Sequence, residues 1–488
     1  MSLRIKEHPI LDFTGREEVT FYFNGERVIG YSGDSIAAAL HANGVKKLSD
    51  SLKLGRPRGF FCGIGKCSSC LMKVNGIPNI RTCIAPIEEG IRVETQPKFA
   101  PWPDVKEENW EKGLKVNTDI LVVGAGPAGL SASIEAARQG AEVLLVDENP
   151  RVGGQLIKQT HKFFGSKFER AGVRGIHIAE ELEEELRKEK KIRLLLESTV
   201  FGVYEDPMSK GFVFGVIERR NYKTRLVKVV CRKVIVSVGA TENMLLFPGN
   251  DLPGVYGAGG VQTLMNVYGV RPGNKVLMVG AGNVGLIVSY QLLQAGVEVD
   301  RVVEAAPVIG GYHVHAAKLR RCGVPIYTSH SIKEVYGDGY VEGAVVVELD
   351  ENWEPIEGTE ENVKCDTVCL AVGLTPSTRL LEQLQVEMVD IAEAGGRVAL
   401  HDENMETTIR GVYVAGDSSG IEEASTAMLE GRIAGVSAAN SLGYNRGGER
   451  LIEEYRKRLR QLRAGPFGEK PRIAKEKMKE LWEEHHGL

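Results

Sequence analysis

Four of the eight cysteines in this 488-residue chain gather in one short stretch, at Cys62, Cys67, Cys70 and Cys83. The pattern Cys-x4-Cys-x2-Cys with a fourth cysteine downstream matches the ligand spacing of plant-type 2Fe-2S clusters, although the last gap of 12 residues is shorter than in plant ferredoxins. A tetrahedral zinc site and inert thiols are alternatives that the spacing leaves open. We favour the cluster because the cysteines follow a ferredoxin-like strand and helix pattern and precede a nucleotide-binding pattern.

The loop between the first two cysteines, Cys62-Gly-Ile-Gly-Lys-Cys67, carries two glycines. Such a loop can turn its backbone N–H groups towards the sulfide ions of a cluster. We expect Lys66, Arg56 and Arg58 to offset the negative charge of the cluster.

A glycine pattern suited to a dinucleotide begins at Gly124, between the strand-like run DILVV and a helix pattern, and an acid ends the next strand-like run. The first glycine makes a tight turn, the second admits a pyrophosphate and the third lets the helix pack on the sheet, while the acid accepts a ribose hydroxyl. The residues that we expect to contact the dinucleotide here are Gly124, Gly126, Pro127, Ala128, Gly129, Asp147 and Glu148.

The segment TTIRGVYVAGD at 407–417 favours FAD over NAD at this first site. It resembles the closing motif of flavoproteins with two dinucleotide folds, in which the final Asp holds the ribityl chain and the next helix points its N-terminus at the flavin pyrimidine ring. The resemblance gives Asp417 that role and predicts a helix from about Ile421. A surface strand that ends in a turn is the alternative.

Two further segments are expected beside the flavin. ENPRVGGQL should pass over it, and KVIVSVGAT is an apolar strand that runs into a glycine at the edge of the domain. From these segments and the closing motif we expect contacts by Gly153, Gly154, Gln155, Gly239, Ala240, Gly416 and Asp417.

A second glycine pattern repeats the first after the run KVLMV, and its strand-end acid lies 19 residues beyond the last glycine. An acid at that position favours NAD(H) or an adenine nucleotide over NADP(H). Retention of the loop for packing alone is the alternative. The residues predicted to line this site are Gly280, Gly282, Asn283, Gly285 and Glu304.

Other chemistries are disfavoured. No Cys-x-x-Cys pair lies near either glycine loop, so disulfide exchange has no nucleophile there. His313 and His315 are interpreted as a packed or solvated pair rather than a metal site. A net charge of −4 argues against nucleic acid, and the absence of a signal sequence or a spanning apolar run predicts a cytoplasmic chain without a membrane span.

These motifs need elements to position them, and the patterns predict an α/β fold: two dinucleotide-binding, glutathione-reductase-like domains preceded by a small α+β ferredoxin-like 2Fe-2S domain. Hairpins are expected at Asn24-Gly25 and Asn75-Gly76, with a helix between them that Ser32 or Asp34 caps. The predicted parts are a 2Fe-2S domain at 1–96, a linker at 97–117, a discontinuous FAD domain at 118–255 and 373–444, an inserted nucleotide domain at 256–372 and a helical tail at 445–488.

The ordered motifs resemble the α-type subunits of dye-linked L-proline dehydrogenase, heterotetrameric sarcosine oxidase, opine oxidase and hydrogen cyanide synthase. The resemblance rests on the four-cysteine pattern, GAGPAG, ENPRVGGQL, GAGNVG, EAAP and YVAGD. It implies a smaller partner β subunit that binds its own FAD and oxidises a secondary amine or amino acid, an FMN shared at the subunit interface, and further small subunits. This chain would then be a flavin-dependent oxidoreductase subunit that relays electrons through FAD and the cluster to an unidentified acceptor, without a catalytic acid or base of its own.

A self-contained NADH-dependent flavin and iron-sulfur oxidoreductase is the second hypothesis, in which hydride passes from the second site to FAD. A scaffold with vestigial sites is the third. It is the weakest, because it makes the cysteines, Asp147 and Asp417 coincidental.

Overall fold

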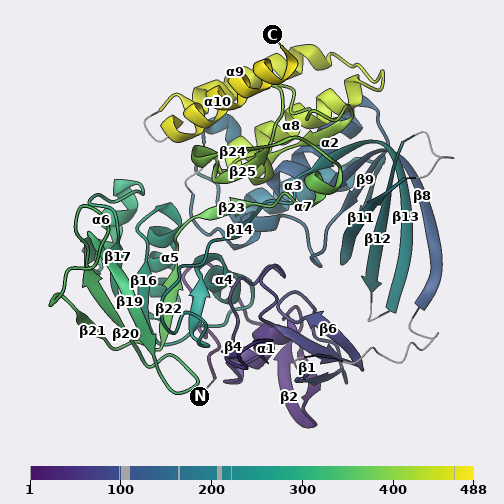
Figure 1. Ribbon diagram of the computed structural model, residues 1–488. Helices are drawn as coiled ribbons and strands as arrows, with labels where there is room; N and C mark the ends of the chain where they lie inside the picture. The colour runs from purple at the N-terminus through teal and green to yellow at the C-terminus, as the bar shows by residue number, and fades with distance from the viewer. Residues whose placement is uncertain are drawn as a thin grey trace. The chain divides into compact units, whose positions relative to one another are not determined.

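The computed structural model describes residues 2–97, 99–100, 110–162, 165–205, 211–220, 223–465 and 468–487. Contacts divide the chain into two compact units, each built from two separate stretches of sequence (Figure 1). Unit 1 comprises residues 1–104 and 242–373, and unit 2 comprises residues 105–241 and 374–488.

The N-terminal part of unit 1 is a five-stranded sheet with one helix against it. The sheet order is β2-β1-β7-β5-β6. Its elements are β1 (Glu18–Phe23), β2 (Glu26–Tyr31), α1 (Ile36–Ala42), β5 (Leu71–Val74), β6 (Ile77–Arg81) and β7 (Arg92–Glu94), with a short pair β3 (Ser49–Asp50) and β4 (Pro57–Arg58) beside it. Asn24, Gly25, Asn75 and Gly76 all have positive φ angles, which confirms the two predicted hairpin turns.

The predicted cap of α1 is wrong by one residue. Ser35, rather than Ser32 or Asp34, caps the helix by accepting a hydrogen bond from the Ala38 N–H at 3.3 Å. Asp34 is instead buried, accepts the Tyr31 N–H at 3.0 Å and pairs with Arg4. A side chain committed to a buried ion pair is not available as a helix cap.

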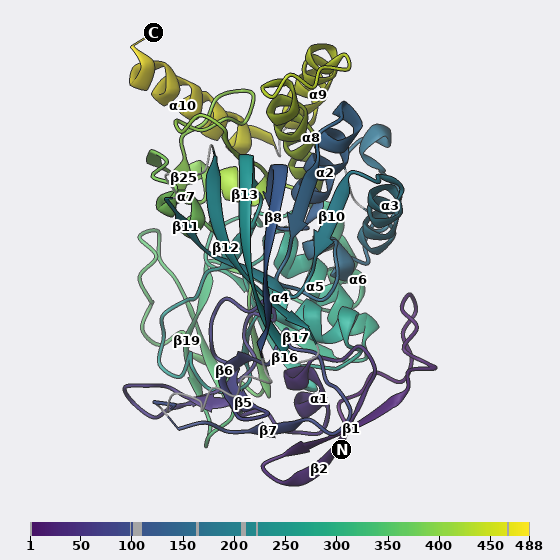
Figure 2. The same ribbon diagram turned by 90° about the vertical axis from the view of Figure 1, so that its right-hand side faces the viewer.

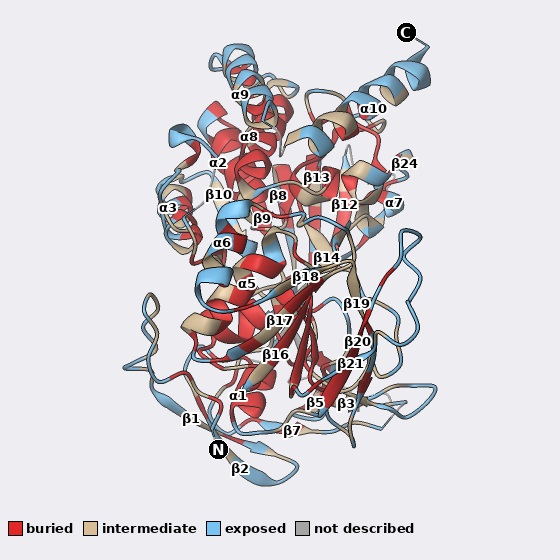
Figure 3. Ribbon diagram, turned by 90° about the vertical axis from the view of Figure 1, so that its left-hand side faces the viewer, coloured by how far each residue is buried: buried red, intermediate tan, exposed pale blue. Residues whose placement is uncertain are grey.

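The second part of unit 1 is a parallel sheet of order β15-β22-β16-β17-β18, with a three-stranded antiparallel sheet, β19-β20-β21, beside it. The strands are β15 (Val255–Gly257), β16 (Lys275–Val279), β17 (Glu298–Glu304), β18 (Ile326–Thr328), β19 (His330–Tyr336), β20 (Gly343–Glu348), β21 (Glu361–Val363) and β22 (Thr367–Leu370). The helices are α4 (Ala258–Gln262), which continues into a π-helical turn (Thr263–Val267), α5 (Asn283–Gln294) and α6 (His313–Arg321). Figure 3 shows β16 buried and the strands of the β1–β2 hairpin mostly intermediate or exposed.

Residues 242–255 belong to this unit and not, as the sequence suggested, with the first nucleotide domain. Leu245, Phe247 and Leu252 pack against the core that β16 and β22 contribute to. Tertiary packing therefore places the change of domain 14 residues earlier than the glycine pattern indicated.

Unit 2 contains a seven-stranded sheet of order β10-β9-β8-β13-β12-β11, in which β26 also pairs with β13 (Figure 2). Its elements are β8 (Trp110–Val123), α2 (Pro127–Gln139), β9 (Val143–Val146), α3 (Gly175–Lys188), β10 (Ile192–Leu195), β11 (Ser198–Tyr204), β12 (Phe212–Arg220), β13 (Lys223–Val236) and β26 (Val412–Val414). Smaller elements are β14 (Ala240–Glu242), β23 (Leu374–Pro376), α7 (Arg379–Gln383), β24 (Met388–Ile391) and β25 (Gly396–Ala399). The helices after them are α8 (Ala424–Asn440), α9 (Gly448–Arg463) and α10 (Glu469–His486).

Strand β8 separates two cores by strict alternation. Ile120 and Val122 pack with α2, α3 and α8, whereas Leu121 and Val123 pack with β12 and β13 on the other face. Burial on both faces explains why the strand reads as a continuous apolar run in the sequence.

Part of the predicted linker is strand. Of residues 97–117, Lys98 and 101–109 lie outside the described residues, but β8 begins at Trp110 and pairs in parallel with β13 from Thr224 onward. The first four residues of KVIVSVGAT likewise belong to a longer strand, the 14-residue β13. A neighbouring strand supplies the hydrogen bonds that a polar, non-periodic segment needs to extend a sheet.

The C-terminal tail forms two helices that dock on unit 2. Ile452, Tyr455 and Leu459 of α9 join the core beneath α8, and Ala474 and Met478 of α10 join a cluster with the β24–β25 hairpin. Among the described helices, none combines the length and apolar character needed to cross a bilayer.

Candidate cofactor sites

The four clustered cysteines come together in unit 1. The Cys62 sulfur contacts those of Cys67 and Cys83, and Cys70 contacts Cys83. Hydrogen bonds from Cys67 and Cys83 lower the pKa of Cys62, while the pKa of Cys83 is raised. Cys67 is exposed and the other three are buried, so one edge of the site faces solvent.

The thiols lie in pairwise contact. Two irons that each take two thiolates would use the Cys62–Cys67 and Cys70–Cys83 contacts.

The loop that follows the first ligand position has the backbone shape that the glycines were expected to allow. Gly63 and Gly65 both have positive φ, at 64° and 72°, and the Ile64 N–H points at the Cys62 sulfur from 3.5 Å. An N–H aimed at a ligand sulfur is the contact that tunes an iron-sulfur centre.

Two of the three expected counter-charges have another partner. Arg56 and Arg58 lie 3.5 and 3.7 Å from the Asp251 carboxylate, so both are engaged in ion pairs with the second nucleotide domain. Lys66 is exposed beside Cys67. The sequence could not reveal Asp251 as the partner, because the contact spans almost 200 residues of chain.

The cysteine loop packs directly on the second nucleotide domain within unit 1. The Gly257 N–H donates to the Phe61 carbonyl oxygen at 3.2 Å, and a side chain at Gly260 would overlap that same carbonyl. A Cβ at Gly63 would lie 3.0 Å from the Thr263 Cβ, at the start of the π-helical turn. The loop therefore sits on α4 and its π-helical continuation, a kind of distortion that recurs at functional sites.

In unit 2, the first glycine loop joins β8 to α2 as predicted. Gly126 is the N-cap of α2, Pro127 is its first residue, and no side chain within the described residues caps it. A Cβ at Gly129 would overlap the Gly124 carbonyl, which accounts for the third glycine. The uncapped N–H groups of a helix start are suited to a pyrophosphate.

The predicted acid of this loop lies against the loop backbone. Asp147 is half-buried and accepts the N–H of Ala125 at 2.6 Å and the N–H of Asn149 at 2.8 Å. Removal from water raises the pKa of Asp147, against the lowering effect of these bonds. A carboxylate has about four acceptor positions, so it retains capacity for a ligand hydroxyl. Glu148 follows it, half-buried.

The segment ENPRVGGQL crosses the glycine loop. The Gly153 N–H donates to the Ala125 carbonyl at 2.8 Å, and a Cβ at Gly154 would lie 2.7 Å from the Cα of Gly126. Gln155 follows and is exposed. Only glycine permits this crossing of two backbones.

The structure brings the distant closing motif to the same place. A Cβ at Gly416 would lie 2.9 Å from the Cβ of Ala128, in the first glycine loop. On the other side, the Ser418 hydroxyl donates to the Gly239 carbonyl at 3.2 Å, and Ala240 begins β14 directly after it. The four predicted segments of the first site therefore meet within unit 2.

Asp417 lies in a half-buried position in this junction. Burial raises its pKa to about 7, and the neighbouring carboxylates of Glu430 and Glu422 add to the rise. The helix predicted from Ile421 begins later, with Glu423 as its N-cap and Ala424 as its first residue, because residues 416–419 form a separate 3-10 turn.

A buried ionic cluster beside Asp417 was not predicted from the sequence. Glu430 of α8 is 2% exposed and accepts the Gly416 N–H at 3.0 Å and the Ser419 hydroxyl at 2.7 Å. Its other oxygen lies 2.8 Å from Arg463 and 3.0 Å from Lys475, both from the tail helices. A Glu in an otherwise small and apolar helix, ASTAMLEGRIAG, was the available signal.

The second glycine loop, in unit 1, makes the same backbone hydrogen bonds as the first loop. Glu304 accepts the Ala281 N–H at 2.7 Å and the Ala306 N–H at 3.0 Å, as Asp147 does at the first loop. Gly282 is the N-cap of α5 and a Cβ there would meet nothing within 4 Å, while a Cβ at Gly285 would overlap the Gly280 carbonyl. Asn283 accepts the Tyr312 N–H at 2.8 Å.

The duplication extends further than the two glycine patterns alone indicated. A proline three residues after the acid and a glycine pair at six and seven residues occur in both halves, as Pro307 with Gly310 and Gly311 in the second. A Cβ at Gly311 would lie 2.8 Å from the carbonyl carbon of Gly282, so this segment crosses the second loop as its counterpart crosses the first. The equal spacing of these residues in the two repeats was the signal in the sequence for this longer duplication.

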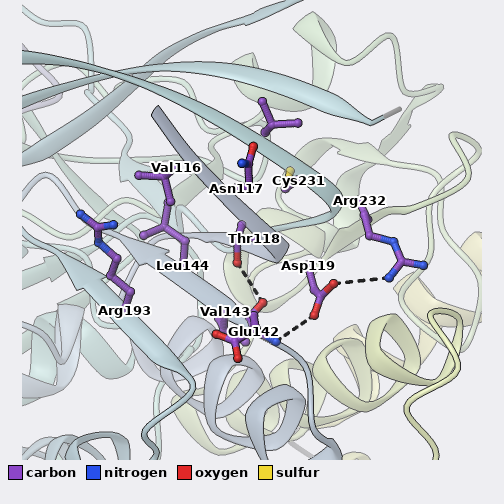
Figure 4. Close-up of a pocket in the computed structure, with 11 residues that line it drawn as sticks. Val116, Asn117, Thr118, Asp119, Glu142, Val143, Leu144, Arg193, Cys231 and Arg232 are labelled. Carbon is purple, nitrogen blue, oxygen red and sulfur yellow. Dashed lines mark hydrogen bonds and ion pairs between the residues drawn. The ribbon is translucent and has the colours of Figure 1, made fainter. Parts of the chain in front are cut away.

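A hollow of about 600 Å³ in unit 2 lies elsewhere, beside the middle of β8 and the amino end of β9. Its polar groups bind one another: Asp119 accepts the Glu142 N–H at 3.0 Å and lies 3.4 Å from Arg232 (Figure 4). Ligands of parallel α/β sheets bind at the carboxyl ends of the strands. We therefore assign no cofactor to this hollow.

Comparison with known proteins agrees with this geometry. The family model described as "Pyridine nucleotide-disulphide oxidoreductase" matches residues 118–431, more than half of the chain, and a "2Fe-2S iron-sulfur cluster binding domain" matches residues 16–98. The chain belongs to the pyridine nucleotide-disulphide oxidoreductase family, with an FAD-binding fold and an N-terminal 2Fe-2S domain.

Among curated proteins, an opine oxidase subunit of Rhizobium meliloti (strain 1021) is 31% identical over 67% of this chain and 71% of its own length. The sarcosine oxidase alpha subunit of Corynebacterium sp. (strain P-1) is 25% identical over 91% of this chain. This chain spans less than half, 39–46%, of the length of the sarcosine oxidase alpha subunits that it matches. Among solved structures, L-proline dehydrogenase from P. horikoshii shares the fold, with a TM-score of 0.69 and 24% identity over 92% of this chain and 79% of that one.

Proposed function

We propose that this member of the family is the electron-transfer subunit of a heteromeric dehydrogenase for a secondary amine or amino acid of the proline, sarcosine or opine type. Two relatives support this reading, since they are named as subunits of a sarcosine oxidase and an opine oxidase. In the proposed complex, a smaller FAD-containing β subunit oxidises the amine, and this chain carries the electrons onward in the cytoplasm.

The observation that carries the proposal is the direct packing of the cysteine loop on a nucleotide-binding domain. Phe61, next to the first cysteine, is bonded to Gly257 at the start of α4, so the iron-sulfur domain and the second nucleotide domain form one compact unit. This contact holds the cysteine site at a fixed separation from the second nucleotide site of the same unit, as electron transfer between bound cofactors requires.

When bound, FAD stores two electrons and a 2Fe-2S cluster passes single electrons. The chain's part is to hold and tune them. In this proposal the glycine loop and α2 receive the pyrophosphate, Asp147 a ribose hydroxyl, Asp417 the ribityl chain, and Cys62, Cys67, Cys70 and Cys83 the irons.

At the second site we propose NAD(H) or another adenine nucleotide on Gly280, Gly282, Asn283, Gly285 and Glu304. The space around Gly282 fits a pyrophosphate, and the carboxylate of Glu304 fits a ribose. An FMN at the interface with the partner subunit is a further proposal, based on the family resemblance.

The intact second loop also favours one other function, an NADH-dependent oxidoreductase that needs no partner. Anaerobic titration of the purified chain separates the two. We expect its flavin to stay oxidised with NADH and with L-proline or sarcosine, and to bleach with the amine once the β subunit is added. Rapid bleaching by NADH alone would establish the second function instead.

A further inference from the structure

The tail helices α9 and α10 lie beyond the part of the chain that the oxidoreductase family model covers, residues 118–431. The hydrophobic faces of these helices explain how they dock. They do not explain why each helix has a largely buried cationic side chain. Arg463, the last residue of α9, is 12% exposed, and Lys475 of α10 is 17% exposed. Burying two cations is costly unless they neutralise something.

The group that they neutralise is Glu430, on the helix after the closing motif. Arg463 binds Glu430 at 2.8 Å and Glu422 at 2.6 Å. These two ion pairs connect α9 to α8 and to the segment that follows Asp417. Lys475 binds Glu430 at 3.0 Å and also donates to the Ser419 carbonyl at 3.2 Å. Both cations thus bind the 416–422 segment directly.

Glu430 in turn binds the backbone on the N-terminal side of Asp417 and a side chain on its C-terminal side. Its second oxygen accepts the Gly416 N–H and the Ser419 hydroxyl, one residue before and two residues after Asp417. Gly431, the next residue of α8, lies so close to α2 that a Cβ would overlap the Ala128 carbonyl. The ionic cluster is therefore fixed against the first glycine loop as well.

The cluster pairs two acids, Glu422 and Glu430, with two bases, Arg463 and Lys475, beside Asp417. Burial and Lys475 lower the pKa of nearby His401 to about 3 and keep it neutral. Each cation removed makes the surroundings of Asp417 more negative, and loss of the Glu430 charge makes them less negative.

We propose that Arg463 and Lys475 are positioning residues of the flavin site, which hold the Asp417 turn through Glu430 and set the electrostatic potential at the pyrimidine end of FAD. The inference rests on the proposed function, in that FAD must bind at Asp417. It makes the C-terminal tail part of the redox site.

The test compares Lys475→Met, Glu430→Gln and the double variant, with Lys477→Met as the matched control, since Lys477 lies two residues farther along α10 and forms an exposed pair with Glu393. FAD content, the FAD dissociation constant and the flavin midpoint potential are measured, the last by anaerobic photoreduction against a reference dye. Negative charge on reduced flavin is favoured by positive surroundings. Lys475→Met should lower the potential and Glu430→Gln should raise it, each changing the ratio of reduced to oxidised flavin at fixed poise by about tenfold.

The double variant should return close to the wild-type potential, and Lys475→Arg, which keeps the charge, should retain it. Single variants that bind FAD with unchanged potentials, or that both shift in the same direction, would overturn the inference. If Glu430→Gln fails to fold, the contrast between Lys475→Met and Lys475→Arg decides alone. Wild-type protein without flavin would instead refute the proposed function on which the inference rests.

Discussion

The carbonyl oxygen of Phe61 accepts a hydrogen bond from the Gly257 N–H at 3.2 Å. Phe61 directly precedes the first cysteine of the cluster site, and Gly257 directly precedes α4 of the second nucleotide domain. This backbone hydrogen bond therefore connects the cysteine site to the second nucleotide domain of unit 1. The packing around the bond can be tested by mutation.

Gly260→Ala should separate docking from helix propensity. Alanine normally stabilises a helix by about 0.5–1 kcal/mol relative to glycine. Here the added Cβ would overlap the Phe61 carbonyl, so we expect a net loss of about 1–3 kcal/mol in the free energy of unfolding, with reduced iron content. Denaturant unfolding measures it, with Gly465→Ala, which has open space, as the control.

Arg4→Met should loosen the N-terminal domain from its neighbour. Arg4 binds the buried Asp34 and also donates to the Tyr268 carbonyl at 3.2 Å, while Arg16 stands farther from Asp34, at 3.5 Å. Loss of hydrogen bonds to a charged group costs about 1.5–3 kcal/mol. Lys73→Met, which breaks an exposed pair with Glu94, should cost less than about 1 kcal/mol. Equal losses in the two variants would contradict this view of the contact.

Cys70→Ser should abolish the cluster. In the wild type we expect two irons and two labile sulfides per chain, and in Cys70→Ser at least about a tenfold loss of both, because the buried thiolate is replaced. Cys322→Ser, at an exposed cysteine outside the cluster, serves as the control. One zinc per chain and no sulfide in the wild type would establish the zinc alternative.

Asp417 should make the apo chain less stable as pH rises. Its pKa of about 7 exceeds the ordinary value near 3.8, so between these values the folded state holds a proton that the unfolded state has lost. The stabilisation is full below about pH 4 and disappears by about pH 7. Relative to the wild type, Asp417→Asn should gain about 1–2 kcal/mol on going from pH 5 to pH 8. Denaturant unfolding of flavin-free protein measures this, and a pH-independent difference would show that Asp417 titrates normally.

Local patterns predicted much of this architecture. The two glycine loops, the hairpin turns at Asn24-Gly25 and Asn75-Gly76, and both tail helices depend on neighbours in sequence, and the structure confirms them. The meeting of Gly416 with Ala128 was also predictable, because both belong to recognisable motifs of one fold.

What the sequence could not predict depends on pairing across the chain. The strand at Trp110 extends only because β13 lies beside it, and Asp34 does not cap α1 because Arg4 binds it. The roles of Arg463 and Lys475 were hidden for the same reason: on a charged amphipathic helix, a residue that reaches a buried Glu looks like its exposed neighbours.

We propose that electrons leave this chain through the cysteine site after arriving from a partner subunit. The most direct measurement uses the complex assembled with the β subunit, reduced anaerobically by the amine, with either wild-type chain or Cys70→Ser. We expect amine-dependent flavin bleaching in both complexes, and reduction of a one-electron acceptor only in the wild type, with the electron paramagnetic resonance signal of a reduced 2Fe-2S centre. Acceptor reduction that proceeds equally in the Cys70→Ser complex would contradict the account.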